Sequence, residues 1–189
     1  MNQTPAVKKL YNDGLIKNGG HALDLGCGKG MDVLSLANLD FEVDAVDVDA
    51  TALDNLKSEL AKDEYKDSKV NIVNQKIEDF KVKEGVYDCI IAINSLPFID
   101  SKEKVIEIIK NIVLGLKEDG CMYITLFGKK DAWTDKENMS FFEYGEIKNV
   151  LDSLGDVSFY HSTIEEGYGK TIKGDIKYWN IFRFIYIKK

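Results

Sequence analysis

Apolar residues repeat along this chain with two spacings, one typical of β-strands and the other of amphipathic helices. Short apolar runs ending in turn residues, such as 87–93, indicate strands, and segments with an apolar residue every three or four positions, such as 101–116, indicate helices. Asp49 is well placed to cap a helix that follows it. The pattern predicts strands at 21–25, 41–48, 70–73, 87–93, 121–127, 157–164 and 179–187, and helices at 31–39, 50–65, 101–116 and 141–154.

This alternation of strands and helices predicts an α/β fold, a doubly wound three-layer sandwich around a mostly parallel seven-stranded sheet. Only a loop, residues 165–177, separates the last two strands, so we expect a hairpin and one antiparallel strand near the C-terminus. No repeat or linker divides the sequence. We therefore expect one domain over residues 1–189, in which 1–19 form a helical lead-in.

Three glycines, Gly26, Gly28 and Gly30, lie directly after the first predicted strand and open the first predicted helix. Glycines at such a turn permit a left-handed backbone and close approach of a ligand. The spacing is not the dinucleotide pattern G-x-G-x-x-G, because Met31 occupies the position of the third glycine. Asp24, at the end of the apolar strand, would be costly to bury unless a cationic group accompanied it.

A second acid stands where the next strand ends. Asp47 follows Gly26 by 21 residues, and in such folds an acid about 20 residues beyond the first glycine accepts hydrogen bonds from ribose hydroxyls. Asp44 lies before the strand end and Asp49 is the expected helix cap, so we prefer Asp47. Together these features suit an adenosine ligand with a positive group and no pyrophosphate, and S-adenosylmethionine has both properties.

With these features the sequence resembles the class I S-adenosylmethionine-dependent methyltransferases, which have a Rossmann-like methyltransferase fold. The resemblance implies that Asp24 and Gly26 serve the methionine moiety, Asp47 the ribose, and Ile77 the adenine, with Asn94 beneath the sulfonium. Cys27, Gly28, Gly30, Val48 and Glu78 complete the cofactor site that it implies. It rests on Leu23-Asp-Leu-Gly-Cys-Gly-Lys-Gly30, Ala45-Val-Asp-Val48, Asn74-Gln-Lys-Ile-Glu-Asp-Phe80, Tyr87-Asp-Cys-Ile-Ile-Ala-Ile-Asn-Ser95 and Leu116-Lys-Glu-Asp-Gly-Cys-Met-Tyr-Ile124.

A narrower likeness is to the tellurite-resistance-type methyltransferases. It rests on Ser95-Leu-Pro-Phe98, Leu126-Phe-Gly128, Asp131-Ala-Trp133 and Lys177-Tyr-Trp-Asn180. This chain departs from the pattern at three positions: many relatives have aspartate in place of Lys76, and relatives commonly have histidines in place of Tyr178 and Asn180.

The acceptor pocket should be roofed by residues that follow the fourth and fifth strands, because ligands of such sheets bind at the carboxyl ends of the strands. We expect it to comprise Ser95, Leu96, Phe98, Phe127 and Trp133, with Tyr178 beside the last loop. Aromatic residues at these positions are equally typical of ordinary packing.

Composition and charge limit the kinds of partner and the location that we expect for this protein. A net charge of −7 and a single arginine, Arg183, argue against nucleic-acid binding. The longest apolar run is far shorter than the roughly 20 residues of a membrane span. Cys27, Cys89 and Cys121 form no Cys-x-x-Cys pair, so we expect reduced thiols, no metal site and a cytoplasmic location.

These features predict an enzyme that methylates a small molecule, for which a thiol or a chalcogen oxyanion suits because a soft nucleophile needs no base. No catalytic residue is assigned, and a monomer and a homodimer both remain open. The alternatives are a non-catalytic regulatory domain that binds S-adenosylmethionine, a protein or RNA methyltransferase, and a nicotinamide oxidoreductase, which the glycine spacing disfavours.

Overall fold

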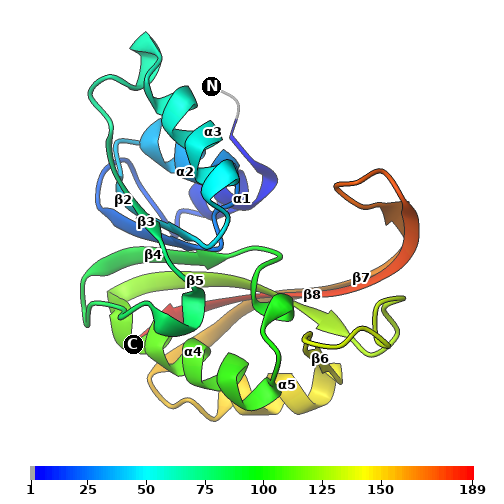
Figure 1. The fold of residues 1–189 in the computed structure, drawn as a ribbon. Helices are drawn as coiled ribbons and strands as arrows, with labels where there is room; N and C mark the ends of the chain where they lie inside the picture. Colours follow the sequence, from blue (N-terminus) through cyan, green and yellow to red (C-terminus); the bar gives the residue numbers. More distant parts are fainter. Residues whose placement is uncertain (1–2) are drawn as a thin grey trace.

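The computed structural model describes residues 3–189 and has three layers, with one twisted sheet between two groups of helices (Figure 1). The predicted order of alternating elements is confirmed, and most bounds agree within a few residues. The strands are β1 (His21–Leu25), β2 (Glu42–Asp47), β3 (Lys69–Asn74), β4 (Tyr87–Ala92), β5 (Leu116–Gly128), β6 (Phe141–Phe142), β7 (Val157–Lys170) and β8 (Ile176–Lys188).

The strand order is β3-β2-β1-β4-β5-β8-β7, and β6 pairs with the end of β5 outside this path. β1 to β6 pair in parallel, whereas β8 is antiparallel to both β5 and β7. The expected mostly parallel sheet with a reversed strand is therefore confirmed, and β6 makes its strands eight rather than seven. The chain turns from β1 toward β2 on one side and β4 on the other, which creates a switch point at the carboxyl ends of β1 and β4.

Five α-helices of the described residues 3–189 cover the sheet. α1 (Pro5–Asn12), α2 (Met31–Ala37) and α3 (Ala50–Leu60) lie on one face, and α4 (Lys102–Gly115) and α5 (Tyr144–Asp152) lie on the other (Figure 1). Successive strand residues face opposite layers, so Ala22 packs with the first group and Leu23 with the second. Within residues 3–189, no helix is both long and apolar enough to cross a bilayer.

The last hairpin corrects one sequence prediction. The segment 165–177, expected as a loop, is mostly strand: β7 continues to Lys170 and β8 begins at Ile176. The distal strands pair only with each other and extend beyond the rest of the sheet (Figure 1). Side chains there are exposed on both faces, so the sequence lacks the alternation of a half-buried strand.

A second correction concerns the helix predicted at 141–154. It begins only at Tyr144, because Phe141 and Phe142 pair with Phe127 and Gly128 and so form β6. The helix predicted at 50–65 similarly ends at Leu60 and is followed by a short 3-10 turn, Asp63–Tyr65. Asp49 caps α3 as predicted, since its carboxylate accepts the N–H groups of Thr51 and Ala52.

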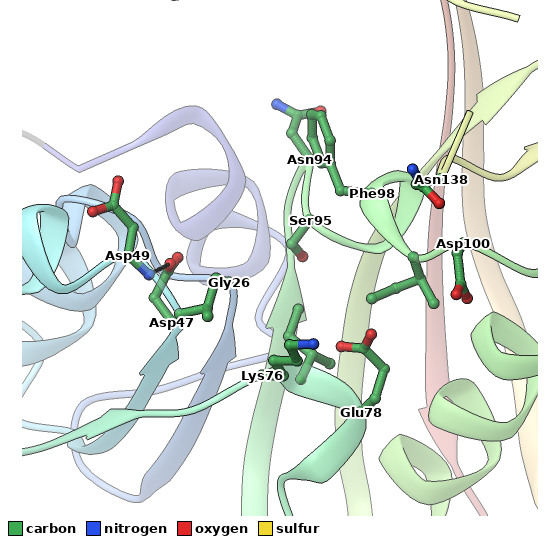
Figure 2. A pocket seen from close by; sticks show the side chains of 13 residues that line it. Gly26, Asp47, Asp49, Lys76, Glu78, Asn94, Ser95, Phe98, Asp100 and Asn138 are labelled. Carbon is green, nitrogen blue, oxygen red and sulfur yellow. Dashed lines mark hydrogen bonds between the residues drawn. The ribbon is translucent and has the colours of Figure 1, made fainter. Parts of the chain in front are cut away.

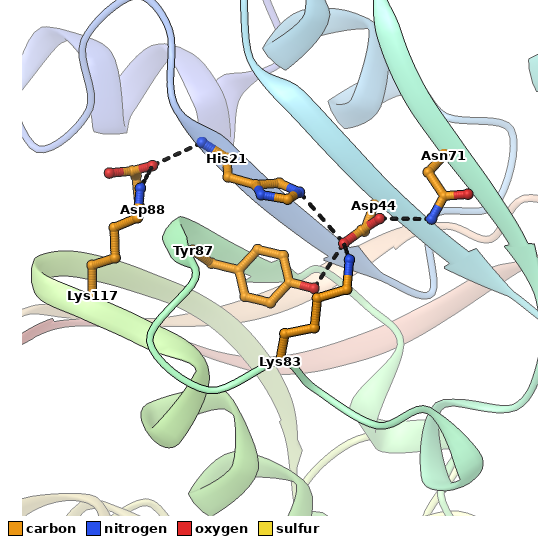
Figure 3. A network of polar contacts seen from close by, with 7 residues as sticks. All are labelled: His21, Asp44, Asn71, Lys83, Tyr87, Asp88 and Lys117. Carbon is orange, nitrogen blue, oxygen red and sulfur yellow. Dashed lines mark hydrogen bonds and ion pairs between the residues drawn. The ribbon is translucent and has the colours of Figure 1, made fainter.

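A buried polar network joins the first strands of the sheet toward their amino-terminal ends, on the side opposite the switch point (Figure 3). Its centre is Asp44, which is 3% exposed and accepts hydrogen bonds from Tyr87 Oη at 2.8 Å, Asn71 Nδ2 at 2.7 Å and Lys83 Nζ at 3.1 Å. His21 Nε2 lies 3.5 Å from the same carboxylate. Burial alone would raise the pKa of Asp44, but the donors Asn71, Tyr87 and Lys83 hold that pKa below its usual value.

Replacing Tyr87 with phenylalanine should lower the free energy of unfolding by about 1–3 kcal/mol near neutral pH, because Asp44 loses a buried donor. A carboxyl with a depressed folded-state pKa stabilises the fold above its unfolded pKa and loses this contribution as the pH falls through its folded pKa. The variant raises that folded pKa, so its deficit should shrink as the pH is lowered toward about 3. Urea unfolding across this range, with exposed Tyr11→Phe as control, tests this; a pH-independent deficit would contradict it.

Candidate active site

A cavity of about 660 Å³ lies at the carboxyl ends of β1, β2 and β4 (Figure 2). Eight of the residues expected in the functional site line it. They are Gly26, Asp47, Val48, Ile77, Glu78 and Asn94 from the expected cofactor site, and Ser95 and Phe98 from the expected acceptor pocket. The sequence reasoning did not place Asp49, Lys76, Ile99, Asp100 and Asn138 here, although the structure does. We refer to this space as the acidic cavity, because Asp47, Asp49, Glu78 and Asp100 outnumber Lys76 in its lining.

Gly26 of the glycine turn lines the acidic cavity, whereas Cys27, Gly28 and Gly30, which the sequence also predicts in the cofactor site, do not line it. The turn has little room for side chains at Gly26 and Gly30. Gly26 has φ = 80°, and a Cβ atom there would lie 2.2 Å from Ser95 Cβ. Gly30 has the same φ, and its Cβ would lie 2.3 Å from Leu56 Cδ1. Gly28 has φ = 52° but open space around its Cα. The turn therefore needs glycine for packing at Gly26 and Gly30, and its left-handed backbone favours glycine at all three positions.

Asp47 connects the glycine turn to the end of β2. Its Oδ2 atom accepts the N–H of Gly28 at 2.7 Å. Its Oδ1 atom accepts the N–H of Asp49 at 2.8 Å (Figure 2). Asp44, the other acid considered from the sequence, lies away from the cavity in the network of Figure 3. Asp49 does line the cavity, but its carboxylate caps α3.

Asp24 lies behind the lining with its carboxyl group buried. It is 3% exposed, and no hydrogen bond or ion pair within residues 3–189 engages its carboxylate. Burial, and then the charges of Asp32 and Asp47, raise its pKa well above the usual range. Burial likewise raises the pKa of the neighbouring Cys27 thiol, so this cysteine is not a thiolate nucleophile. A buried acid whose ionisation is opposed in this way is the environment that a cationic ligand group would relieve.

The acidic cavity fits S-adenosylmethionine on these grounds: acidic lining for a cationic ligand, Gly26 in the lining for close backbone approach, and the buried acid Asp24 behind it. Ser95 Oγ is also buried without a hydrogen-bond partner among residues 3–189. Asn94 lies two residues beyond the end of β4 and has φ = 54°, and its N–H donates to Thr125 Oγ1. This left-handed turn at the strand end carries Asn94 and Ser95 to the cavity (Figure 2).

A second cavity, of about 750 Å³, adjoins the first and shares Asn94 and Phe98 with it. We call it the aromatic cavity, because Phe98, Phe127, Trp133 and Trp179 line it. The ring centroids of Trp133 and Trp179 are 5.4 Å apart, those of Phe127 and Trp179 5.6 Å apart, and those of Phe98 and Trp133 6.2 Å apart. These tilted and edge-on rings form one continuous apolar surface.

Two residues expected in the acceptor pocket lie outside both cavities. Leu96 is fully buried in the core beneath α4. Tyr178 packs edge-on against Tyr168 in the hairpin, and its hydroxyl donates to Glu166. Sequence reasoning missed the neighbouring Lys177 and Trp179, which do line the aromatic cavity. Alternation along the strand shows that residues 177 and 179 face the side opposite to residue 178, but it does not show which side meets the cavity.

Lys177 lies within the aromatic cluster. It is 7% exposed, forms an ion pair with the buried carboxylate of Asp131, and places its Nζ 3.8 Å from the ring centroids of both Trp133 and Trp179. Burial lowers its pKa from the usual value, although the Asp131 carboxylate opposes that shift. Asp131 also accepts the N–H groups of Trp133 and Asn180, so this buried pair fixes the two aromatic segments relative to each other.

Comparison with known proteins agrees with this geometry. The family model described as a methyltransferase domain matches residues 22–120, which is 99 of the 189 residues. No curated protein matches the sequence.

Solved structures share the fold. TehB from Haemophilus influenzae superposes with a TM-score of 0.78 at 20% identity, over 96% of this chain and 62% of that one, so this chain spans less than two thirds of TehB. An S-adenosylmethionine-dependent methyltransferase from Methanosarcina mazei gives 0.73 at 16% identity, over 100% and 99% of the two chains. Magnesium protoporphyrin IX methyltransferase from Synechocystis PCC 6803, solved with bound S-adenosylmethionine, gives 0.68 at 17% identity, over 97% and 76%.

The fold and the matched domain define an S-adenosylmethionine-dependent methyltransferase of class I. The chain belongs to the methyltransferase domain family, is an enzyme, and uses S-adenosyl-L-methionine as its cofactor.

Proposed function

We propose that this enzyme transfers the methyl group of S-adenosylmethionine to a small molecule, and that a thiol or a chalcogen oxyanion is a suitable acceptor. The observation that carries this proposal is the pair of adjoining cavities, which share Asn94 and Phe98. One has an acidic lining for a cationic cofactor, and the other has an aromatic lining for an acceptor. Their shared border is the natural place for a methyl group to pass between two ligands.

Each part of the acidic cavity has a role in holding the cofactor. Asp24 and the acidic lining favour its positive charges, and the Gly26–Gly30 turn allows close approach of the methionine moiety. Asp47 and Val48 would hold the ribose, and Ile77 and Glu78 the adenine. S-adenosylmethionine, when bound, supplies a methyl group on a cationic sulfur, which keeps both electrons of the broken bond as the acceptor's lone pair forms the new one.

The protein's main contribution to the reaction is alignment and exclusion of water, because methyl transfer is an in-line displacement. Asn94 and Phe98 border both ligands, and the rings of Phe127, Trp133 and Trp179 shield the acceptor side. Neither His21 nor His161 lines either cavity. An acceptor that reacts as an anion has no proton to lose, so this lining is consistent with an acceptor that needs no general base.

Calorimetric titration with S-adenosylmethionine and S-adenosylhomocysteine tests the cofactor site. We expect micromolar binding of both ligands and at least about tenfold weaker binding by Asp47→Ala, which loses a charged hydrogen-bond acceptor and the tie to Gly28. Asp54→Ala, which changes an exposed acid on α3, is the matched control and should bind as the unmodified protein does.

Failure of both ligands to bind would overturn the proposed function. Once binding is established, formation of S-adenosylhomocysteine in the presence of thiols, selenite and tellurite tests the acceptor. Methylation confined to protein or RNA substrates would favour the macromolecular alternative instead.

A further inference from the structure

The two cavities have linings of opposite charge. The acidic cavity has four carboxylates and one lysine in its lining. The aromatic cavity is lined by Lys136, Lys170, Lys173 and Lys177 and by a single acid, Asp175. The chain as a whole carries a net charge of −7, so the basic lining runs against the overall composition. Such a local excess raises the concentration of ligands of the opposite sign.

Three of these lysines keep their charge available for a ligand. Lys136, Lys170 and Lys173 have no carboxylate within 4.0 Å anywhere in the described residues 3–189. They are exposed at the rim of the cavity, and Lys136 Nζ lies 4.0 Å from the ring centroid of Trp133. Lys177 differs, because Asp131 already neutralises it inside the aromatic cluster. The charge is thus at the rim, and the aromatic surface lies beneath it.

The size and apolar surface of the aromatic cavity indicate the kind of anion. A space of about 750 Å³ lies within the range of cavities that hold drug-sized organic molecules. An inorganic oxyanion would fill little of it and would leave the partly exposed rings of Trp133 and Trp179 in contact with water. A molecule with an apolar body would cover those rings and gain the hydrophobic contribution.

We propose that the acceptor is an organic anion, whose apolar body packs on Phe127, Trp133 and Trp179 and whose anionic group faces Lys136, Lys170 and Lys173. This inference rests on the proposed function: it keeps a small-molecule acceptor and favours an organic anion over an inorganic chalcogen oxyanion. The opposite linings also sort the two ligands: a cationic cofactor is disfavoured in the aromatic cavity, and an anionic acceptor is disfavoured in the acidic one. A cationic amine would be a poor acceptor for the same reason.

Intrinsic fluorescence offers a local readout, because Trp133 and Trp179 are the chain's two tryptophans and both line the aromatic cavity. The protein, saturated with S-adenosylhomocysteine, is titrated with three matched probes: para-tert-butylbenzoate, the neutral para-tert-butylbenzamide and the cationic para-tert-butylbenzylammonium. We expect the benzoate to bind roughly tenfold more tightly than the amide, as a few partly solvated ion pairs would give, and the ammonium to bind weakest. Added salt should reduce the difference in affinity between the benzoate and the amide by weakening the binding of the benzoate.

A combined Lys136→Met, Lys170→Met and Lys173→Met variant tests the rim directly. It should bind the benzoate and the amide with similar affinity, while keeping the affinity of the unmodified protein for S-adenosylhomocysteine. The three side chains are exposed, so circular dichroism and the thermal midpoint should be unchanged. Lys110→Met, an exposed lysine on the remote helix α4, is the matched control and should keep the preference for benzoate.

Several outcomes would overturn the inference and leave the cofactor site intact. One is binding of the amide or the ammonium as tightly as the benzoate by a protein that binds S-adenosylhomocysteine normally. A second is binding of tellurite, selenite or acetate as tightly as the benzoate, which would mean that the apolar body contributes nothing. Tighter binding of an octameric oligouridylate would indicate an RNA acceptor. Loss of S-adenosylhomocysteine binding itself would instead be the failure of the proposed function.

Discussion

Replacing Asp24 with asparagine should weaken the binding of S-adenosylhomocysteine at least about tenfold and, at the same time, stabilise the ligand-free protein. The affinity falls because the buried carboxylate that would balance the ligand's ammonium group is gone. The stability rises because burial and the nearby charges of Asp32 and Asp47 oppose ionisation of Asp24 in the free protein. The substitution should therefore raise the stability of the ligand-free protein and lower its affinity for S-adenosylhomocysteine.

The sign of the pH dependence of stability follows from the raised pKa of Asp24. Above the unfolded-state pKa of about 3.9, the unfolded chain ionises Asp24 while the folded protein still holds its proton. The folded state then binds more protons, so the stability of the unmodified protein falls as the pH rises through this window. Asparagine does not titrate, and its advantage should therefore be small at about pH 4 and reach about 1–3 kcal/mol near pH 7.

Thermal unfolding without ligand at both pH values measures this effect. For a chain of this size we expect a rise of about 2–4 °C for each kcal/mol gained. Asp63→Asn, which changes an exposed acid in the 3-10 turn after α3, should alter neither the stability nor the affinity. A variant that is destabilised near neutral pH, or one that binds S-adenosylhomocysteine normally, would contradict this account of Asp24.

Replacing Gly26 with alanine should have a large effect on both folding and cofactor binding. The new Cβ would lie 2.2 Å from Ser95 Cβ, and the backbone would keep φ = 80°. The left-handed backbone costs about 1–2 kcal/mol for a residue with a side chain, and overpacking adds about 1–3 kcal/mol. Because Gly26 lines the acidic cavity, any movement that relieves the contact also displaces its wall.

Urea unfolding of two further variants separates the cost of the left-handed backbone from the cost of overpacking against Ser95. Gly28→Ala has φ = 52° but no atom within 4 Å of its new Cβ, so it should lose only the backbone contribution. Combining Gly26→Ala with Ser95→Gly removes the atom that is struck and should recover part of the lost stability. Equal losses for Gly26→Ala and Gly28→Ala would show that close packing against Ser95 is unimportant.

The parts of the site that the sequence predicted are those specified by local signals. The turn at Gly26–Gly30 directly follows a buried strand, and Asp47 stands where the next strand ends, so short stretches of sequence are enough to place them. The prediction of Asp47 over Asp44 also followed from position alone: in a parallel sheet the residue at the carboxyl end reaches the ligand edge. The structure places Asp47 at the acidic cavity and Asp44 in the network around Tyr87.

The parts that the sequence did not predict depend on contacts between distant segments. Lys136 and Lys173 are separated by several elements and meet at one cavity only because the hairpin folds back beside the segment after β5. Tyr178 was selected over Trp179 because nothing local shows which face of β8 is turned toward that cavity. The distal hairpin is not predicted as strand, since neighbouring residues such as Glu165 and Glu166, which point to opposite faces, are both exposed and give no periodic signal.

The position of β8 has a consequence for how the chain acquires its structure. β8 follows β7 in the sequence but lies between β5 and β7 in the sheet, and β7 has no other strand partner among the described residues. During synthesis β7 therefore has no strand to pair with until β8 has been made. The two strands can then pair as a hairpin, and β8 can pair with β5. Until then the edge of β5 that pairs with β8 has no partner, so the incomplete chain exposes a strand edge that another chain could pair with.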